Sequence, residues 1–152
     1  MVGTVMSTLY SRILVPLENS ATDATILTHI RLLARIHGSQ LILVHVADGF
    51  VARYQSQLNL QDSEEMKKDM IYLKDCAAAL IADGFSADVY LELGDAAERI
   101  VHVAIEHKCD LIAMSTHGHK AIKDLFLGSV ASAVRHSTSI PVLLVRSDAG
   151  VG

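Results

Sequence analysis

Short apolar runs rich in Val, Ile and Leu alternate along this chain with longer segments whose apolar residues recur at helical spacing. Nearly continuous runs, typical of strands buried on both faces, are "RILVPL" (12–17), "LILVHV" (41–46), "DLIAM" (110–114) and "IPVLLV" (140–145). "ADVYLEL" (87–93) alternates, which predicts a strand with one less apolar face. Because strands that alternate with helices favour a parallel sheet with right-handed crossovers, we expect an α/β fold. We expect this fold to contain a single doubly wound five-stranded parallel sheet with helices on both faces.

Four segments between these runs carry helix signals. In the first, Ser20 is the expected N-cap and Gly38 the expected end. Its apolar residues recur at helical spacing at Ile26, Ile30, Leu33 and Ile36. Further helices are predicted over 62–84, with acids in its first turn, over 95–109 and over 129–137.

The residues from Ala47 to about Leu60 show no clean period and are expected to form a loop. The 152 residues, 51% hydrophobic and 20% charged, suit one ordinary globular domain rather than a disordered chain. We expect that domain over 10–146, with flexible segments at 1–9 and 147–152.

Charge and hydropathy exclude several classes of partner. The net charge of −4 gives no general reason to expect nucleic acid. No segment is apolar for long enough to span a bilayer, and the first residues lack the pattern of a signal peptide. Cys76 and Cys109 form no CxxC pair, which fits a reducing compartment and buried or half-buried thiols. We therefore expect no membrane partner and a cytoplasmic location.

The stretch "STHGHKAIKDLFLGS" (115–129) combines glycines, polar residues and a following helix. The backbone at Gly118 can approach an anion closely, because glycine has no Cβ. Gly128 and Ser129 precede a helix, whose free N–H groups favour an anion, and Ser129 is the expected N-cap. Local chemistry leaves two interpretations open, a phosphate cradle and simple turn punctuation.

The longer run "MSTHGHKAIKDLFLGSVA" resembles the nucleotide-binding signature of the universal stress protein superfamily, G-x2-G-x9-G-[ST]. The glycines of the signature fall on Ser115, Gly118 and Gly128, and its final residue on Ser129. "RILVPLENS", "LILVHV", "GDAAERIV", "CDLIAMSTHG" and "IPVLLV" match other family blocks in the expected order. The resemblance covers about residues 10 to 146.

The resemblance implies the sheet order 3-2-1-4-5, ATP as the ligand and, usually, a homodimer. Carried over by position, the residues beside adenosine would be Pro16, Leu17, Glu18 and Val46. Those holding ribose and phosphates would be Ser115, Gly118, Gly128, Ser129 and Val130, with Mg or Mn bound through the phosphates. The chain departs from the usual pattern at Ser115, where Gly is usual, and at Glu18 and Asn19, where Asp-Gly is usual.

Within the resemblance, the apolar last strand (140–145) would lie at the edge of the sheet, where a two-fold partner could pair with it. His45 lies inside an apolar run and is expected to be a satisfied core histidine rather than a ligand. His117 and His119 lack an evident third ligand for a metal.

Three functions follow from these observations. The first is an ATP-binding regulatory module of the stress response, read by an unknown protein partner. The second is a slow ATPase or nucleotidyl-transfer enzyme. Since no Walker motif and no paired acid and base are present, we expect at most very slow ATP hydrolysis. The third is a nucleotide-free dimeric scaffold, which retention of Gly118, Gly128 and Ser129 disfavours. Another adenine nucleotide, such as AMP or cyclic AMP, remains an alternative to ATP.

Overall fold

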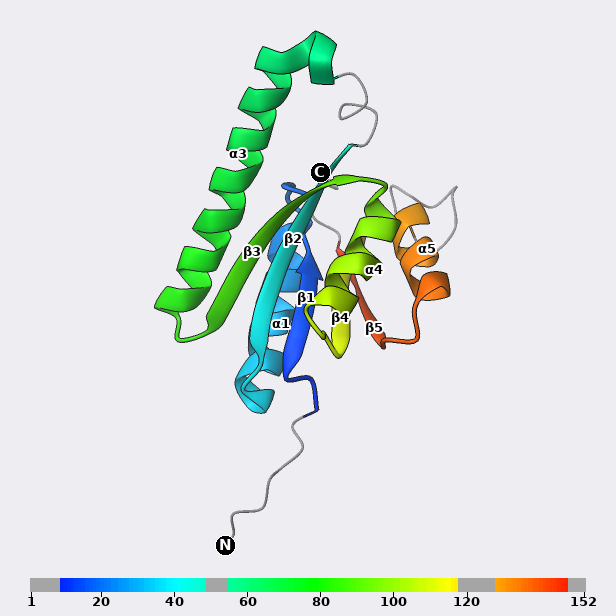
Figure 1. The fold of residues 1–152 in the computed structure, drawn as a ribbon. Coiled ribbons are helices and arrows are strands. Elements are labelled where there is room, and N and C mark those ends of the chain that lie inside the picture. Colours follow the sequence, from blue (N-terminus) through cyan, green and yellow to red (C-terminus); the bar gives the residue numbers. More distant parts are fainter. Residues whose placement is uncertain (1–8, 49–54, 118–127, 148–152) are drawn as a thin grey trace, which may run out of the picture.

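The computed structural model describes residues 9–48, 55–117 and 128–147. In chain order the elements are β1 (Arg12–Pro16), α1 (Asp23–His37), β2 (Gln40–Asp48), α3 (Gln55–Ala82), β3 (Ser86–Gly94), α4 (Ala96–Glu106), β4 (Leu111–His117), α5 (Ser129–Ser137) and β5 (Val142–Ser147). The five strands pair in parallel in the order β3-β2-β1-β4-β5 (Figure 1). The predicted fold class and strand order are confirmed.

Alternating side chains of the central strand feed two separate cores. Ile13 and Val15 of β1 pack in the cluster that α1 and α3 cover, whereas Leu14 packs in the cluster under α4 and α5 (Figure 1). All three are fully buried, and burying such a side chain contributes roughly 1.5–3 kcal/mol to folding. This two-sided burial explains why the strand is a continuous apolar run in the sequence.

The second helix along the chain, α3, differs most from the helix predicted over 62–84. β2 continues to Asp48 and α3 begins at Gln55, so the loop predicted up to about Leu60 is wrong from Gln55 onward. For the same reason no acids lie in the first turn of α3. Figure 1 shows this end of α3 standing beyond the sheet. The sequence carries no helical apolar period there, so periodicity alone could not predict this part of the helix.

The ends and faces of the other elements differ in smaller ways. Ile36 of α1 is 78% exposed, and Ala34 takes the buried position instead. The N-cap of α1 is Thr22 rather than Ser20, whereas Gly38 ends the helix in the left-handed region with φ 65°, as predicted.

The predicted loop 115–129 begins with three residues of β4, which runs to His117. Residues 118–127, including Gly118 and His119, lie outside the described part of the chain. Cys76 is half-buried and Cys109 is buried, as predicted. None of the described helices is both long enough and apolar enough to cross a membrane.

Candidate functional site

A cleft opens at the carboxyl ends of β1, β2 and β4. β1 and β4 are neighbours in the sheet, so the cleft lies where the strand order reverses, the usual ligand position in open parallel sheets. Its volume of about 330 Å³ is within the range of small-molecule sites. Its lining consists of Pro16, Leu17, Glu18, Asp23, Val44, His45, Val46, Ala96, Ile100, Met114, Ser115, Thr116, Gly128, Ser129, Val130 and Ala131.

Every predicted site residue that the structure describes lines this one cleft. They are Pro16, Leu17, Glu18, Val46, Ser115, Gly128, Ser129 and Val130. The remaining predicted residue, Gly118, is outside the described residues. The fold thus gathers segments that are more than 100 residues apart in the sequence, from residue 16 to residue 130.

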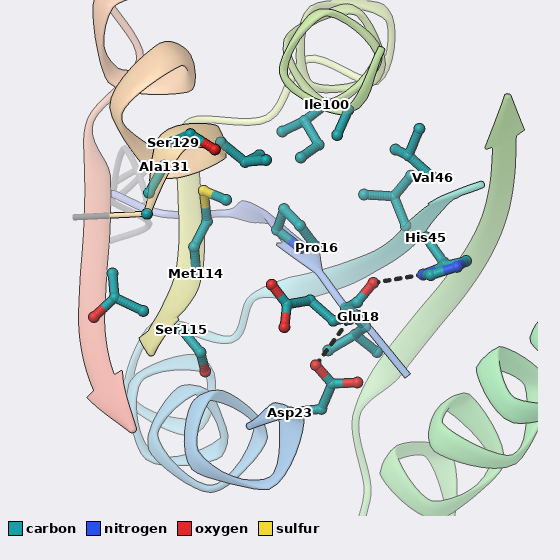
Figure 2. A pocket seen from close by; sticks show the side chains of 16 residues that line it. Pro16, Glu18, Asp23, His45, Val46, Ile100, Met114, Ser115, Ser129 and Ala131 are labelled. Carbon is teal, nitrogen blue, oxygen red and sulfur yellow. Dashed lines mark hydrogen bonds between the residues drawn. The ribbon is translucent and has the colours of Figure 1, made fainter. Parts of the chain in front are cut away.

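One side of the cleft is apolar. Val46 from β2, Ile100 from α4 and Met114 from β4 point toward one another beside Pro16 (Figure 2). Sequence reasoning missed Ile100 and Met114, because each belongs to an apolar pattern that burial in the core explains by itself. Only the topology shows that both side chains reach the cleft.

The β1–α1 loop, residues 16–23, forms a second side that we call the loop wall. Its centre is Asp23, which is only 2% exposed. The Asp23 carboxylate accepts from the backbone N–H of Glu18 at 2.9 Å, of Asn19 at 2.8 Å and of Ser20 at 3.3 Å. Tyr72 of α3 donates its hydroxyl to the same carboxylate. Sequence reasoning missed Asp23, which looks like an ordinary first-turn acid.

The Glu18 side chain is also held within the loop wall. Its carboxylate accepts from the Thr22 hydroxyl at 3.2 Å and from the Ser20 hydroxyl at 3.4 Å. The Ser20 and Thr22 hydroxyls lie 2.7 Å apart. These contacts hold an exposed carboxylate at the rim of the cleft.

Ser115 joins β4 to the loop wall. Its hydroxyl donates to the Thr22 carbonyl over 2.9 Å. The residue that replaces the usual signature glycine therefore has an internal partner, across 93 residues of sequence.

The first turn of α5, residues 128–131, forms the opposite side, which we call the helix wall. Gly128 is the N-cap, so the prediction that Ser129 caps this helix is wrong by one residue. The φ of −60° at Gly128 suits any residue, and a Cβ built there meets no described atom within 4 Å. Ser129 and Val130 are exposed. The described part of the fold therefore does not itself require glycine at this position.

The charges of the cleft are unevenly placed. Among its described lining residues there are two carboxylates, Glu18 and Asp23, and no Lys or Arg. An anion would be attracted there by the backbone N–H groups of the helix wall, which carries no acid in its first turn. Lys120 and Lys123 belong to the segment outside the described residues.

His45 lies at the edge of the cleft with both ring nitrogens in contact. Nδ1 is 2.8 Å from the Leu17 carbonyl oxygen, which can only accept, so Nδ1 donates. Nε2 lies 3.4 Å from a carboxylate oxygen of Asp69. His45 is satisfied, as predicted, but it is only partly buried and lines the cleft instead of lying in the core. In the described part of the chain, no group of three His, Cys, Asp or Glu side chains could hold a metal ion.

Comparison with known proteins agrees with this architecture. The model of the universal stress protein family matches residues 9–146. The chain belongs to this family. Universal stress protein MJ0577 of Methanocaldococcus jannaschii is 28% identical over 161 residues, covering 93% of this chain and 98% of that protein. The solved structure of MJ0577 superimposes with a TM-score of 0.75 at 29% identity, over 91% of this chain and 97% of that one.

More distant universal stress proteins share the fold. One from Archaeoglobus fulgidus, in complex with dAMP, has a TM-score of 0.66 at 21% identity, over 90% of this chain and 98% of that one. Another, in complex with cAMP, has a TM-score of 0.63 at 17% identity, over 90% of this chain and 97% of that one.

Proposed function

We propose that this universal stress protein binds ATP in the cleft and acts as a nucleotide-responsive regulatory module. One observation carries the proposal: an apolar slot, a held carboxylate and a helix N-terminus converge in one cleft at the reversal point of the sheet. These three features match the base, the ribose and the phosphates of a nucleotide in turn.

In this arrangement adenine would occupy the apolar slot beside Val46, Ile100 and Met114. The Glu18 carboxylate would accept from ribose hydroxyls. The phosphates would lie against the backbone N–H groups of Gly128 and Ser129, where the absence of a Cβ leaves room for oxygen atoms. Mg or Mn would arrive bound through the phosphates, since the described residues hold no metal cluster.

The distant relatives that hold dAMP and cAMP support adenine as the base. They do not discriminate between phosphate chain lengths. We favour ATP because the chain retains Gly128 and Ser129 of the nucleotide-binding signature that it resembles.

The test is to denature the purified protein, identify released nucleotide by mass spectrometry, and titrate nucleotide-free protein with ATP, AMP and cyclic AMP by calorimetry. We expect ATP to bind more tightly than AMP or cyclic AMP. Binding with no preference for the triphosphate would contradict ATP as the ligand. No binding of any adenine nucleotide would favour the scaffold function.

We further propose that the protein forms a homodimer through β5. This strand ends the sheet order and presents a half-buried apolar run, Val142–Val145, followed by Arg146. β3, at the other edge, carries Asp88 and Glu92, charges that discourage pairing. Sedimentation should report a dimer that Leu144→Lys dissociates, whereas Leu91→Lys on β3 leaves it intact. A monomeric parent at micromolar concentration would overturn this proposal.

A further inference from the structure

Asn19 stands where the family usually has glycine, and it gives this chain a contact that glycine cannot make. Its φ of 61° lies in the left-handed region, which Asn tolerates better than most residues. From that position its side-chain Nδ2 donates to Oδ1 of Asp69 on α3 over 3.1 Å. The replacement therefore connects the loop wall to a helix that supplies none of the described lining residues of the cleft.

Asp69 also reaches a second part of the cleft. Its other oxygen, Oδ2, lies 3.4 Å from Nε2 of His45, and both side chains are only 15% exposed. His45 in turn donates from Nδ1 to the carbonyl of Leu17. One carboxylate on α3 thus contacts Asn19 directly and Leu17 through His45, although Asp69 is not among the described lining residues of the cleft.

A second contact lies one turn further along α3. Tyr72 donates its hydroxyl to Asp23, the carboxylate that organises the backbone of the loop wall. Burial, reinforced by the neighbouring Asp23, raises the pKa of Tyr72, so the phenol stays neutral and donates. Asp69 and Tyr72 are spaced i, i+3 and lie on the same face of the helix.

We propose that Asp69 is a positioning residue through which α3 holds the loop wall in its nucleotide-binding arrangement, using the amide that Asn19 supplies. The inference rests on the proposed nucleotide site. Because coupling between two sites is reciprocal, nucleotide in the cleft stabilises the packing of α3 in return.

The backbone conformation at residue 19 determines which variants test this role. Asn19→Gly suits the left-handed φ and removes only the side-chain contact, while Asp69→Ala removes its acceptor. We expect each variant to bind ATP about tenfold more weakly, as for loss of one hydrogen bond to a charged group. The double variant should be little weaker than Asp69→Ala alone, because Asp69→Ala already removes the contact with Asn19. Asp69→Asn keeps an acceptor for Asn19 and should recover most of the affinity.

Asp75→Ala is the matched control, an exposed carboxylate on the same helix outside this cluster. It should bind ATP like the parent. Hydrogen exchange without nucleotide gives an independent readout: the amides of Glu18, Asn19 and Ser20 should exchange faster in Asp69→Ala than in the parent or in Asp75→Ala.

The outcomes separate the two proposals. Unchanged exchange of these amides in Asp69→Ala, or ATP affinity equal to that of the parent, overturns the positioning role even if the parent binds ATP. Strictly additive losses in the double variant overturn it as well. If the parent binds no nucleotide, the proposed function is wrong. The proposed coupling between nucleotide binding and the packing of α3 is then wrong as well, whatever the exchange rates show.

Discussion

The loop wall and the helix wall border the same cleft, and we propose that both contact the nucleotide, yet they are built differently. In the loop wall, polar groups are occupied by other parts of the protein: Asp23 accepts from three amides and Tyr72, and Glu18 accepts from two hydroxyls. In the helix wall, Gly128 is unstrained, Ser129 is exposed, and first-turn N–H groups have no acceptor within the helix.

This difference indicates which substitutions should change nucleotide affinity without changing the stability of the fold. A change in the loop wall breaks internal hydrogen bonds, so its effect on nucleotide binding comes with a loss of stability. A change at Gly128 or Ser129 of the helix wall breaks no side-chain hydrogen bond within the described part of the chain. Substitutions in the loop wall should therefore lower both the free energy of unfolding and the affinity for nucleotide. Substitutions at Gly128 or Ser129 should lower the affinity and leave the free energy of unfolding nearly unchanged.

The largest expected effect is that of Asp23→Ala. It removes the acceptor of the Glu18 and Asn19 amides, and a buried donor left unsatisfied costs about 1–3 kcal/mol. The free energy of unfolding, measured by urea denaturation, should fall by ~3 kcal/mol or more. The comparison variant is Asp95→Ala, which removes one N-cap bond to Glu98 at an exposed site and should cost about 1 kcal/mol. Equal losses for the two would show that the loop wall is not held as described.

Gly128→Val should lower the affinity for ATP while leaving the free energy of unfolding nearly unchanged. Its φ of −60° accommodates valine, so we expect stability to change by no more than about 1 kcal/mol. The new side chain would project into the space of the phosphates and weaken ATP binding more than tenfold by calorimetry. Gly38→Val is the counterpart: at φ 65° it should lose roughly 1–2 kcal/mol of stability while the folded protein still binds ATP. Parent-like ATP affinity in Gly128→Val would remove the helix wall from the site.

Ser129→Ala should give a smaller effect of the same kind. The exposed hydroxyl would bond to a phosphate oxygen, so its loss should weaken ATP binding by about 0.5–1.5 kcal/mol and leave stability unchanged. Ser132→Ala, one turn further along α5, should bind ATP like the parent. An equal loss in both variants would point to the helix as a whole rather than to this hydroxyl.

The sequence predicted the sheet because every strand has a face to bury, and burial leaves a pattern that can be read along the chain. It failed for the start of α3, a polar segment whose helical structure is unsupported by any apolar period. The same reasoning explains the site. Gly128 and Ser129 were found through a motif, whereas Ile100 and Met114 were hidden within ordinary core periods.

Asp23 shows a different limit of sequence reasoning. Its role depends on a tight loop conformation and on Tyr72, 49 residues away. Nothing local distinguishes it from a solvated acid in the first turn of a helix. Likewise, Asn19 could be recognised as a departure from the family pattern, but its contact with Asp69 required the packing of α3.

The smallest expected effect on ATP affinity is at Ser115, which belongs to β4 yet is bonded to the loop wall. Its hydroxyl donates to the Thr22 carbonyl, so Ser115→Ala should lower the free energy of unfolding by about 0.5–1.5 kcal/mol. Ser115→Gly, which restores the signature residue, should lose a further ~0.5–1 kcal/mol through backbone entropy.

ATP affinity in both Ser115 variants should change less than in Ser129→Ala, because the Ser115 hydroxyl already has a partner within the protein. Paired urea denaturation and calorimetry measure the two quantities on the same samples. If Ser115→Ala kept its stability and lost as much affinity as Ser129→Ala, the hydroxyl would face the ligand rather than Thr22. Ser115 would then behave as the helix wall does, and the division between the two walls would have to be redrawn at the end of β4.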